Sequence, residues 1–319
     1  MALIKNLCCL FVRTSGVFYN FYLVYSIKVK QMSSQKVRGT GFILASALFY
    51  ASYGVWSRLM ANSFGEFSQA WTRGLVLLVG TLILNSIFRF FKPIKKKDWI
   101  WFGVIALMGL NQAPYFYGFK YLNVGTATLL FYAALVIGGY LIGRLSFGEK
   151  ITRVKWISLF LALAGMMAIY RLVLRPDQLL AVVFTVLAGL MGAGGVCYTK
   201  KLSGDYPEIQ IMMSYFISIS VVNFIVSLIV GDPLPAFEFS APWLAQLGYV
   251  TAFLLGNLAV IQGYKRLEPS IASLIGLAEI IFGVVFGAVL FGEVIGWGVV
   301  IGSILILVAA VLPNLKSKV

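Results

Sequence analysis

The sequence predicts an all-α integral membrane protein with ten transmembrane helices, arranged as two inverted five-helix repeats. Three features support this prediction: an apolar composition, ten apolar segments of membrane-spanning length, and basic residues gathered in alternate loops. Of the 319 residues, 60% are hydrophobic and 12% are charged. Soluble domains have about 45–50% apolar and 25% charged residues. A chain this apolar requires lipid as its solvent.

The apolar residues are grouped in segments long enough to cross a bilayer. A transmembrane helix needs about 20 predominantly apolar residues. Short breaks that carry turn-forming residues separate the segments. The ten segments are residues 39–60, 67–88, 99–119, 124–145, 152–170, 179–199, 208–230, 243–264, 270–291 and 295–313.

The chain then divides into an N-terminal extension, two five-helix repeats and a cytoplasmic tail, at residues 1–38, 39–175, 176–313 and 314–319. We expect the extension to be interfacial or disordered. An eleventh span within it would invert the topology that the basic residues indicate. The chain also looks complete from Met32 onward, so whether residues 1–31 belong to the mature protein stays open.

Basic residues gather before the first segment and after the second, fourth, sixth, eighth and tenth. By the positive-inside rule these loops and both termini face the cytoplasm, so we expect a multi-pass protein of the cell (plasma) membrane. This distribution explains the net charge of +15 without a nucleic-acid partner. The residues are Lys36, Arg38, Arg89, Lys92, Lys95, Lys96, Lys97, Arg144, Lys150, Arg153, Lys155, Lys200, Lys201, Lys265, Arg266, Lys316 and Lys318.

The composition argues against an enzyme and against a cofactor. The chain has no histidine, and its three cysteines lack the spacing of metal ligands, so we expect neither zinc nor haem. It has no phosphate-binding loop of the form GxxxxGK[ST], which disfavours nucleotide-driven transport. An intramembrane enzyme needs a convergent catalytic set, whereas only one carboxylate lies deep in an apolar segment.

The two halves of the chain share a repeated pattern. GYLIGRLSFGE (residues 139–149) aligns without a gap on GVVFGAVLFGE (residues 283–293), and GFKYLNVGTATL (118–129) aligns on GYKRLEPSIASL (263–274). Each copy contains five helices, an odd number, so the second copy enters the membrane from the opposite side. Inverted repeats of this kind are typical of transporters that alternate access around a midplane site.

The residues that carry the repeat also carry a family resemblance. Each half ends its fourth helix in FGE and continues with a fifth helix rich in small residues, and the second helix contains QAWTRGLVLL. Over about residues 39–313 the chain resembles the EamA family of the drug/metabolite transporter superfamily. The resemblance implies ten helices in two inverted halves and transport of small metabolites, often export of amino acids. It implies no cofactor. Ile280 stands where the family often has a proline after the glutamate.

Glu279 is the deep carboxylate. It lies about nine residues into the ninth segment, or roughly 13 Å at 1.5 Å per residue. A charged residue near the bilayer centre costs about 2.5–3.5 kcal/mol on insertion scales, so Glu279 should face the interior, be protonated or be paired. The first repeat has Leu135 at the corresponding position, so only one half supplies this group.

Arg73, in the second segment, is the candidate partner of Glu279. Its expected depth is roughly 9 Å from the outer surface, which brings it within reach if the two helices are neighbours. Three interpretations stay open: a structural ion pair, a pair that opens during gating, or an arginine that holds a substrate carboxylate in its bidentate fork.

A second polar set lies in the third and eighth segments, where LNQAPYFYG matches LGNLAVIQG. These side chains should face inward, either as interhelical hydrogen-bond partners or as cavity lining, and Pro114 predicts a kink nearby. Aromatic side chains offer further cavity surface, with the interfacial belt as the alternative. The polar and aromatic candidates are Asn111, Gln112, Asn257, Gln262, Tyr53, Trp56 and Tyr132.

Together these features predict a secondary transporter that exports small metabolites such as amino acids, by alternating access between the two repeats. Its expected partners are a small-molecule substrate and the lipid bilayer, and proton coupling stays open. The alternatives are a passive channel and a non-transporting membrane scaffold. The sequence alone predicts neither the coupling ion nor the oligomeric state.

Overall fold

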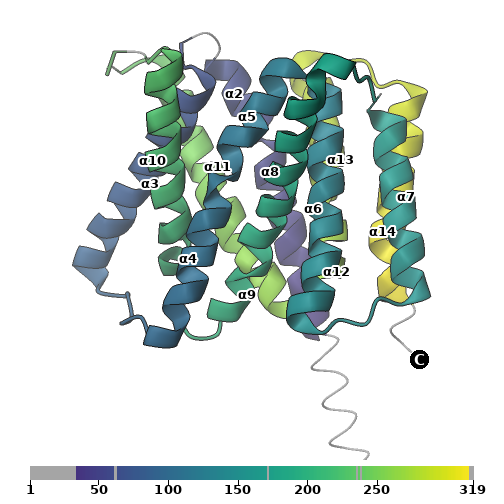
Figure 1. Ribbon diagram of the computed structural model, residues 1–319, viewed down its shortest axis with the longest axis horizontal. Coiled ribbons are helices and arrows are strands. Elements are labelled where there is room, and N and C mark those ends of the chain that lie inside the picture. Colours follow the sequence, from purple (N-terminus) through teal and green to yellow (C-terminus); the bar gives the residue numbers. More distant parts are fainter. Residues whose placement is uncertain (1–33, 61–62, 171, 235, 238, 316–319) are drawn as a thin grey trace, which may run out of the picture.

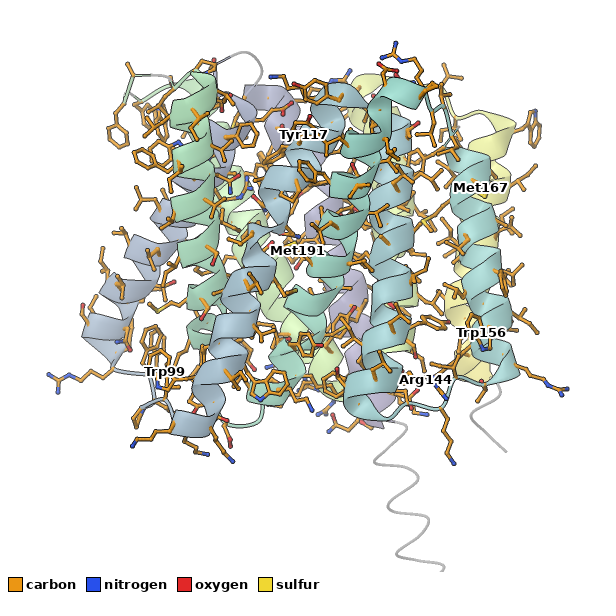
Figure 2. All side chains as sticks on the ribbon, in the orientation of Figure 1. Trp99, Tyr117, Arg144, Trp156, Met167 and Met191 are labelled. Carbon is orange, nitrogen blue, oxygen red and sulfur yellow. The ribbon has the colours of Figure 1, made fainter. Side chains whose placement is uncertain are left out.

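The computed structural model describes residues 34–60, 63–170, 172–234, 236–237 and 239–315. These residues form helices joined by short loops, with no strand among them, and the axes of most helices are roughly parallel or antiparallel to one another (Figure 1). The prediction for residues 1–31 lies outside this range. Figure 2 shows Arg144 at one end of the helices and Tyr117 at the other. We call these ends the Arg144 face and the Tyr117 face.

The helices of the first half are residues 34–51, α2 (Tyr53–Met60), α3 (Glu66–Phe88), α4 (Trp99–Met108), α5 (Gln112–Tyr121), α6 (Val124–Phe147) and α7 (Arg153–Ile169). Those of the second half are α8 (Leu179–Cys197), α9 (Thr199–Leu202), α10 (Glu208–Val230), α11 (Ala241–Arg266), α12 (Pro269–Gly276), α13 (Ala278–Phe291) and α14 (Trp297–Leu315).

Six helical stretches among the described residues are long and apolar enough to cross a membrane. They are Glu66–Phe88, Val124–Phe147, Pro176–Leu202, Glu208–Val230, Ala241–Arg266 and Pro269–Phe291. Others are shorter, such as α7 with 17 residues and the apolar stretch Trp297–Pro313. The protein is therefore an all-helical membrane protein, and the count of ten spans stays a prediction.

The packing follows the two-repeat pattern. The helices that correspond in the two halves pack on each other at opposite ends of the molecule: α3 on α10, and α7 on α14 (Figure 1). Another set of contacts is matched as well. The segment formed by α4 and α5 packs on α8, as its counterpart α11 packs on α2. Each half therefore covers the other rather than folding as a separate unit.

The repeated FGE motif forms the same turn twice. Gly148 and Gly292 end α6 and α13 with positive φ angles of 66° and 67°. This left-handed conformation favours glycine. The next residue closes the turn on the carbonyl six positions back, from Glu149 N to Gly143 O at 2.9 Å and from Glu293 N to Gly287 O at 3.1 Å. A glycine in the left-handed conformation ends many helices in this way. The sequence repeat is therefore a pair of helix ends on opposite faces.

Small residues bring α7 and α14 together. A Cβ atom on Gly302 would lie 2.4 Å from the carbonyl oxygen of Gly165, and one on Gly165 would lie 2.8 Å from that of Gly302. Close backbone approach through small residues is a common way for helices to associate in lipid.

We expect Gly302→Leu to separate α7 from α14 and to lower stability by about 1–3 kcal/mol, as overpacking does in other cores. Thermal unfolding of the purified protein in detergent measures this. The control is Gly80→Leu in α3, where an added Cβ meets no atom within 4 Å. Equal unfolding temperatures for the two variants would contradict the prediction.

Two membrane-length segments break near their middle. In the third segment a 3₁₀ turn (Gly109–Asn111) separates α4 from α5, because Pro114 fits in the first turn of a new helix but not in the interior of a continuing one. In the ninth, α12 ends at Gly276 and α13 begins at Ala278. Glycine is among the poorest helix formers, which favours a break there. Discontinuous helices at the membrane midplane surround the binding sites of many transporters.

Candidate functional site

A cavity of about 210 Å³ lies between the two halves, at the level of these breaks. Residues 34–51 and helices α2, α3, α5, α6, α8, α10, α11, α12 and α13 all contribute to its wall. Seven of the nine residues predicted from the sequence line it: Tyr53, Arg73, Asn111, Gln112, Tyr132, Asn257 and Glu279. The cavity therefore gathers the polar groups of both broken segments.

Arg73 on α3 is almost completely buried at the cavity wall, with 1% of its surface exposed. Its Nη2 donates to Gln112 Oε1 at 3.1 Å. The guanidinium carbon lies 4.0 Å from the ring centre of Tyr249 and 5.0 Å from that of Phe253, which is cation–π geometry. Among the described residues, its Nε and Nη1 atoms are buried and have no hydrogen-bond partner. The guanidinium is thus held by aromatic rings and one amide, and most of its donors are unused.

Glu279 lies in the first turn of α13, immediately after the helix break, and is partly buried. The Tyr132 hydroxyl of α6 lies within hydrogen-bonding reach of its carboxyl group. The positive end of a helix dipole stabilises a negative charge in the first turn. The break therefore places the carboxylate where the helix itself offsets part of the cost of a charge in the membrane.

The ion pair considered for Arg73 and Glu279 is not present. Among the described residues, no carboxylate lies within 4.0 Å of the Arg73 guanidinium. Gln112, Tyr249 and Phe253 surround it instead. Both charged groups line the same cavity, so the structural-pair interpretation is wrong for this conformation. Roles in gating or in substrate binding stay predictions.

Trp56 and Gln262 lie away from the cavity lining. The Trp56 indole packs where a Cβ on Gly248 would be, and its Nε1 donates to Ser52 Oγ at 3.1 Å. Gln262 donates to Glu208 and accepts from Arg266 near the end of α11. These contacts favour the interpretation of Gln262 as an interhelical hydrogen-bond partner.

Aromatic side chains that the sequence reasoning missed form much of the wall. Tyr249 and Phe253 lie under Arg73, and Tyr53 packs on them at ring-centre distances of 4.6 and 5.8 Å. On the other side, Tyr215 donates to Asn111 Oδ1 at 3.0 Å. The sequence did carry a signal for part of this wall. Tyr249, Phe253 and Asn257 follow one another at four-residue spacing, which places them on one face of a helix.

A network of buried charges lies at the Arg144 face of the protein. Glu149 Oε2 accepts from Ser270 Oγ at 2.6 Å and from Lys155 Nζ at 3.4 Å, and Lys155 Nζ also donates to Glu268 Oε2 at 2.7 Å. The side chains of Glu149 and Lys155 are only 4% and 7% exposed. This network joins the end of α6 and the start of α7 to the start of α12, at the Arg144 face.

The equivalent position at the Tyr117 face is exposed. Glu293 pairs with Arg58 Nη1 at 2.8 Å, and both side chains are more than half exposed. The helices next to these two sites differ in burial in the same way. Seven of the eight residues of α12 are buried, whereas only three of the fourteen residues of α13 are buried. The described structure is therefore packed more tightly around α12, at the Arg144 face, than around α13, at the Tyr117 face.

No group of His, Cys, Asp and Glu residues within the described ranges could hold a metal ion. The chemistry available is hydrogen bonding, one cation, one carboxylate and aromatic surface. An all-helical membrane protein with broken helices around a central cavity, lined by aromatic rings and a few polar groups, has the architecture of a membrane transporter.

The EamA-like transporter family matches residues 37–171 and again residues 179–315. The chain belongs to this family, one copy in each half, and is thus a transporter of the drug/metabolite type rather than a member of an enzyme family. A solved structure described only as "Crystal structure of protein" covers 90% of this chain and 98% of its own, with a TM-score of 0.72 at 13% identity. That likeness shows the fold alone. No curated protein matches the chain significantly.

Proposed function

We propose that the protein is a secondary transporter that exports small metabolites, such as amino acids, by alternating access between its two repeats. The observation that carries the proposal is the cavity between the halves, which brings Arg73, Glu279 and the amides Asn111, Gln112 and Asn257 together at two helix breaks. Family membership supports the same class.

The cavity has the size for a small solute. Its 210 Å³ corresponds to roughly seven water molecules at about 30 Å³ each, and lies below the range of about 300–1,000 Å³ typical of sites for drug-sized ligands. An aromatic wall with a few polar groups suits a compact molecule that has both an apolar part and polar groups.

The contrast between the two faces supports alternating access. In this proposal the buried Glu149–Lys155 network holds the Arg144 face closed. By its basic loops this face is cytoplasmic in the proposed topology of ten spans with both termini inside. The exposed Arg58–Glu293 pair occupies the equivalent place on the opposite face. In the second conformation, the network would open while the Tyr117 face closes.

Reconstituted vesicles test this function. A metabolite panel that includes the amino acids is first compared in cells with and without the protein, to find compounds whose efflux depends on it. Proteoliposomes loaded with such a compound should then show counterflow, the transient uptake of labelled solute against its gradient. Counterflow requires a carrier that reorients. Flux without counterflow would indicate the passive channel, and no flux of any compound would indicate the scaffold.

We expect Gly276→Leu to block transport by filling the cavity. Gly276 lines the cavity, and an added Cβ would meet no atom within 4 Å, so the longer side chain can enter the space without disturbing the fold. Transport should fall about tenfold or more, with little change in unfolding temperature. The matched control is Gly103→Leu on α4, which is exposed and equally free of contacts. Similar transport by both variants would contradict the proposed pathway.

A further inference from the structure

The buried Arg73 guanidinium has hydrogen-bonding capacity that the protein does not use. Arginine carries five N–H donors and cannot be deprotonated in a protein. Gln112 accepts from Nη2, whereas Nε and Nη1, which carry three of the five donors, are buried and have no partner in the part of the chain that the structure describes. Native structures leave few buried donors unsatisfied, and each such group needs an explanation.

The surroundings of Arg73 stabilise a cation without neutralising it. The rings of Tyr249 and Phe253 lie beside the guanidinium, and the Gln112 carbonyl is a neutral acceptor. A carboxylate in that acceptor's place would make charge-assisted bonds, which are roughly twice as strong as neutral ones. Gln112 also lines the cavity, at the start of α5. Its carbonyl therefore contacts both Arg73 and the space that a solute would occupy.

The charges of the cavity limit which anion can bind. Among the residues that line it, Arg73 is the one cationic side chain and Glu279 the one carboxylate. A dianion such as a phosphate ester would bring two negative charges to a single cation, in a space it shares with an acid. A planar monoanion with two oxygens matches both the charge and the fork of the guanidinium.

We propose that Arg73 is the carboxylate-binding residue of the transport cavity, so that the protein selects solutes with a single carboxylate group. This inference rests on the proposed transport function. It assigns substrate selectivity to one residue, with Tyr249, Phe253 and Gln112 as positioning residues that hold the guanidinium at the wall.

The test compares each acid with its own primary amide, which keeps the shape and removes the charge. The probes are L-lactate and lactamide, isovalerate and isovaleramide, and L-leucine and L-leucinamide, added to the purified full-length protein in detergent. Ligand-induced stabilisation against heat reports binding. In the wild-type protein we expect at least one acid to bind about tenfold or more tightly than its amide.

Two variants separate recognition from folding. Arg73→Gln should abolish the preference for acid over amide, and Arg73→Lys should keep part of it, because lysine retains the charge but lacks the planar fork. Arg58→Gln, which removes an exposed ion pair, should leave the preference unchanged. If Arg73→Gln does not fold, the wild-type and Arg73→Lys measurements still decide the question.

Three results would overturn the inference: equal binding of acids and amides, a preference that persists in Arg73→Gln, or no binding by any of the acids. Counterflow of an uncharged or cationic metabolite, together with any of these, would reject the role of Arg73 while the transport function stands. Absence of counterflow for every solute would reject the transport function itself.

Discussion

Glu279→Gln should reduce transport about tenfold or more while the protein still inserts and folds. Glutamine keeps the size of the side chain and a group that can bond to Tyr132, but it removes the only carboxylate among the cavity-lining residues. Stability should be unchanged or slightly higher, because an ionisable group without a cationic partner within 4.0 Å is costly in the membrane interior.

The measurement is counterflow in proteoliposomes at several pH values, with surface expression and unfolding temperature measured in parallel. The control is Glu293→Gln, the same substitution in an exposed ion pair just after the end of α13. It should have little effect on transport. If Glu279→Gln transports like the wild type at every pH, then neither proton coupling nor gating depends on this carboxyl group.

Lys155→Met should weaken the packing at the Arg144 face of the protein. The substitution leaves Glu149 buried with Ser270 as its remaining side-chain partner, and removal of one member of a buried ion pair typically costs about 3–5 kcal/mol. The cost falls on the conformation in which α12 packs against the α6–α7 turn. The equilibrium between the two access states should therefore shift away from that conformation.

The rate at which Cys197 on α8 reacts with a thiol reagent measures this shift. It is fully buried, next to the cavity-lining residue Val196. With Cys8 and Cys9 replaced by serine, Cys197 is the only thiol of the chain. We expect a water-soluble thiol reagent to modify it at least about tenfold faster in Lys155→Met than in the parent, with a lower unfolding temperature.

The matched control is Lys95→Met, which breaks an exposed pair with Asp205 on the same face, where Nζ and Oδ2 are 3.0 Å apart. Exposed pairs contribute little, so both readouts should stay near those of the parent. The double variant Glu149→Gln/Lys155→Met should recover part of the lost stability, because it leaves no unpaired buried charge. A protected Cys197 and an unchanged unfolding temperature in Lys155→Met would show that the network does not close the cavity.

The sequence predicted the broad architecture because lipid imposes it. Apolar length, basic loops and the FGE repeat are local patterns, and each has a direct physical cause in the bilayer or in helix termination. Pro114 likewise signalled the break before α5. The break at Gly276 was not foreseen, because one glycine in an apolar run costs only about 1 kcal/mol and no proline accompanies it.

The site was only partly predictable because its partners are distant in sequence. Depth alone suggested that Arg73 and Glu279 could meet, whereas the arginine is held by Gln112 and two rings of α11. Which of several nearby groups an arginine contacts depends on helix rotation and rotamer, and hydropathy reports neither. The bonds of Glu149 to Lys155 and Ser270 escaped prediction for the same reason.

The twin FGE turns have a consequence for how the protein responds to its surroundings. Two copies of one backbone turn lie on opposite faces of the protein, with the Glu149 side chain buried and the Glu293 side chain exposed. Mobile ions screen exposed charges over about 10 Å at 0.1 M salt and affect buried pairs much less. Ionic strength on the Tyr117 side should therefore weaken the Arg58–Glu293 contact, while salt on the Arg144 side leaves Glu149 almost untouched. We therefore expect the protein to respond more to salt at the Tyr117 face than to salt at the Arg144 face.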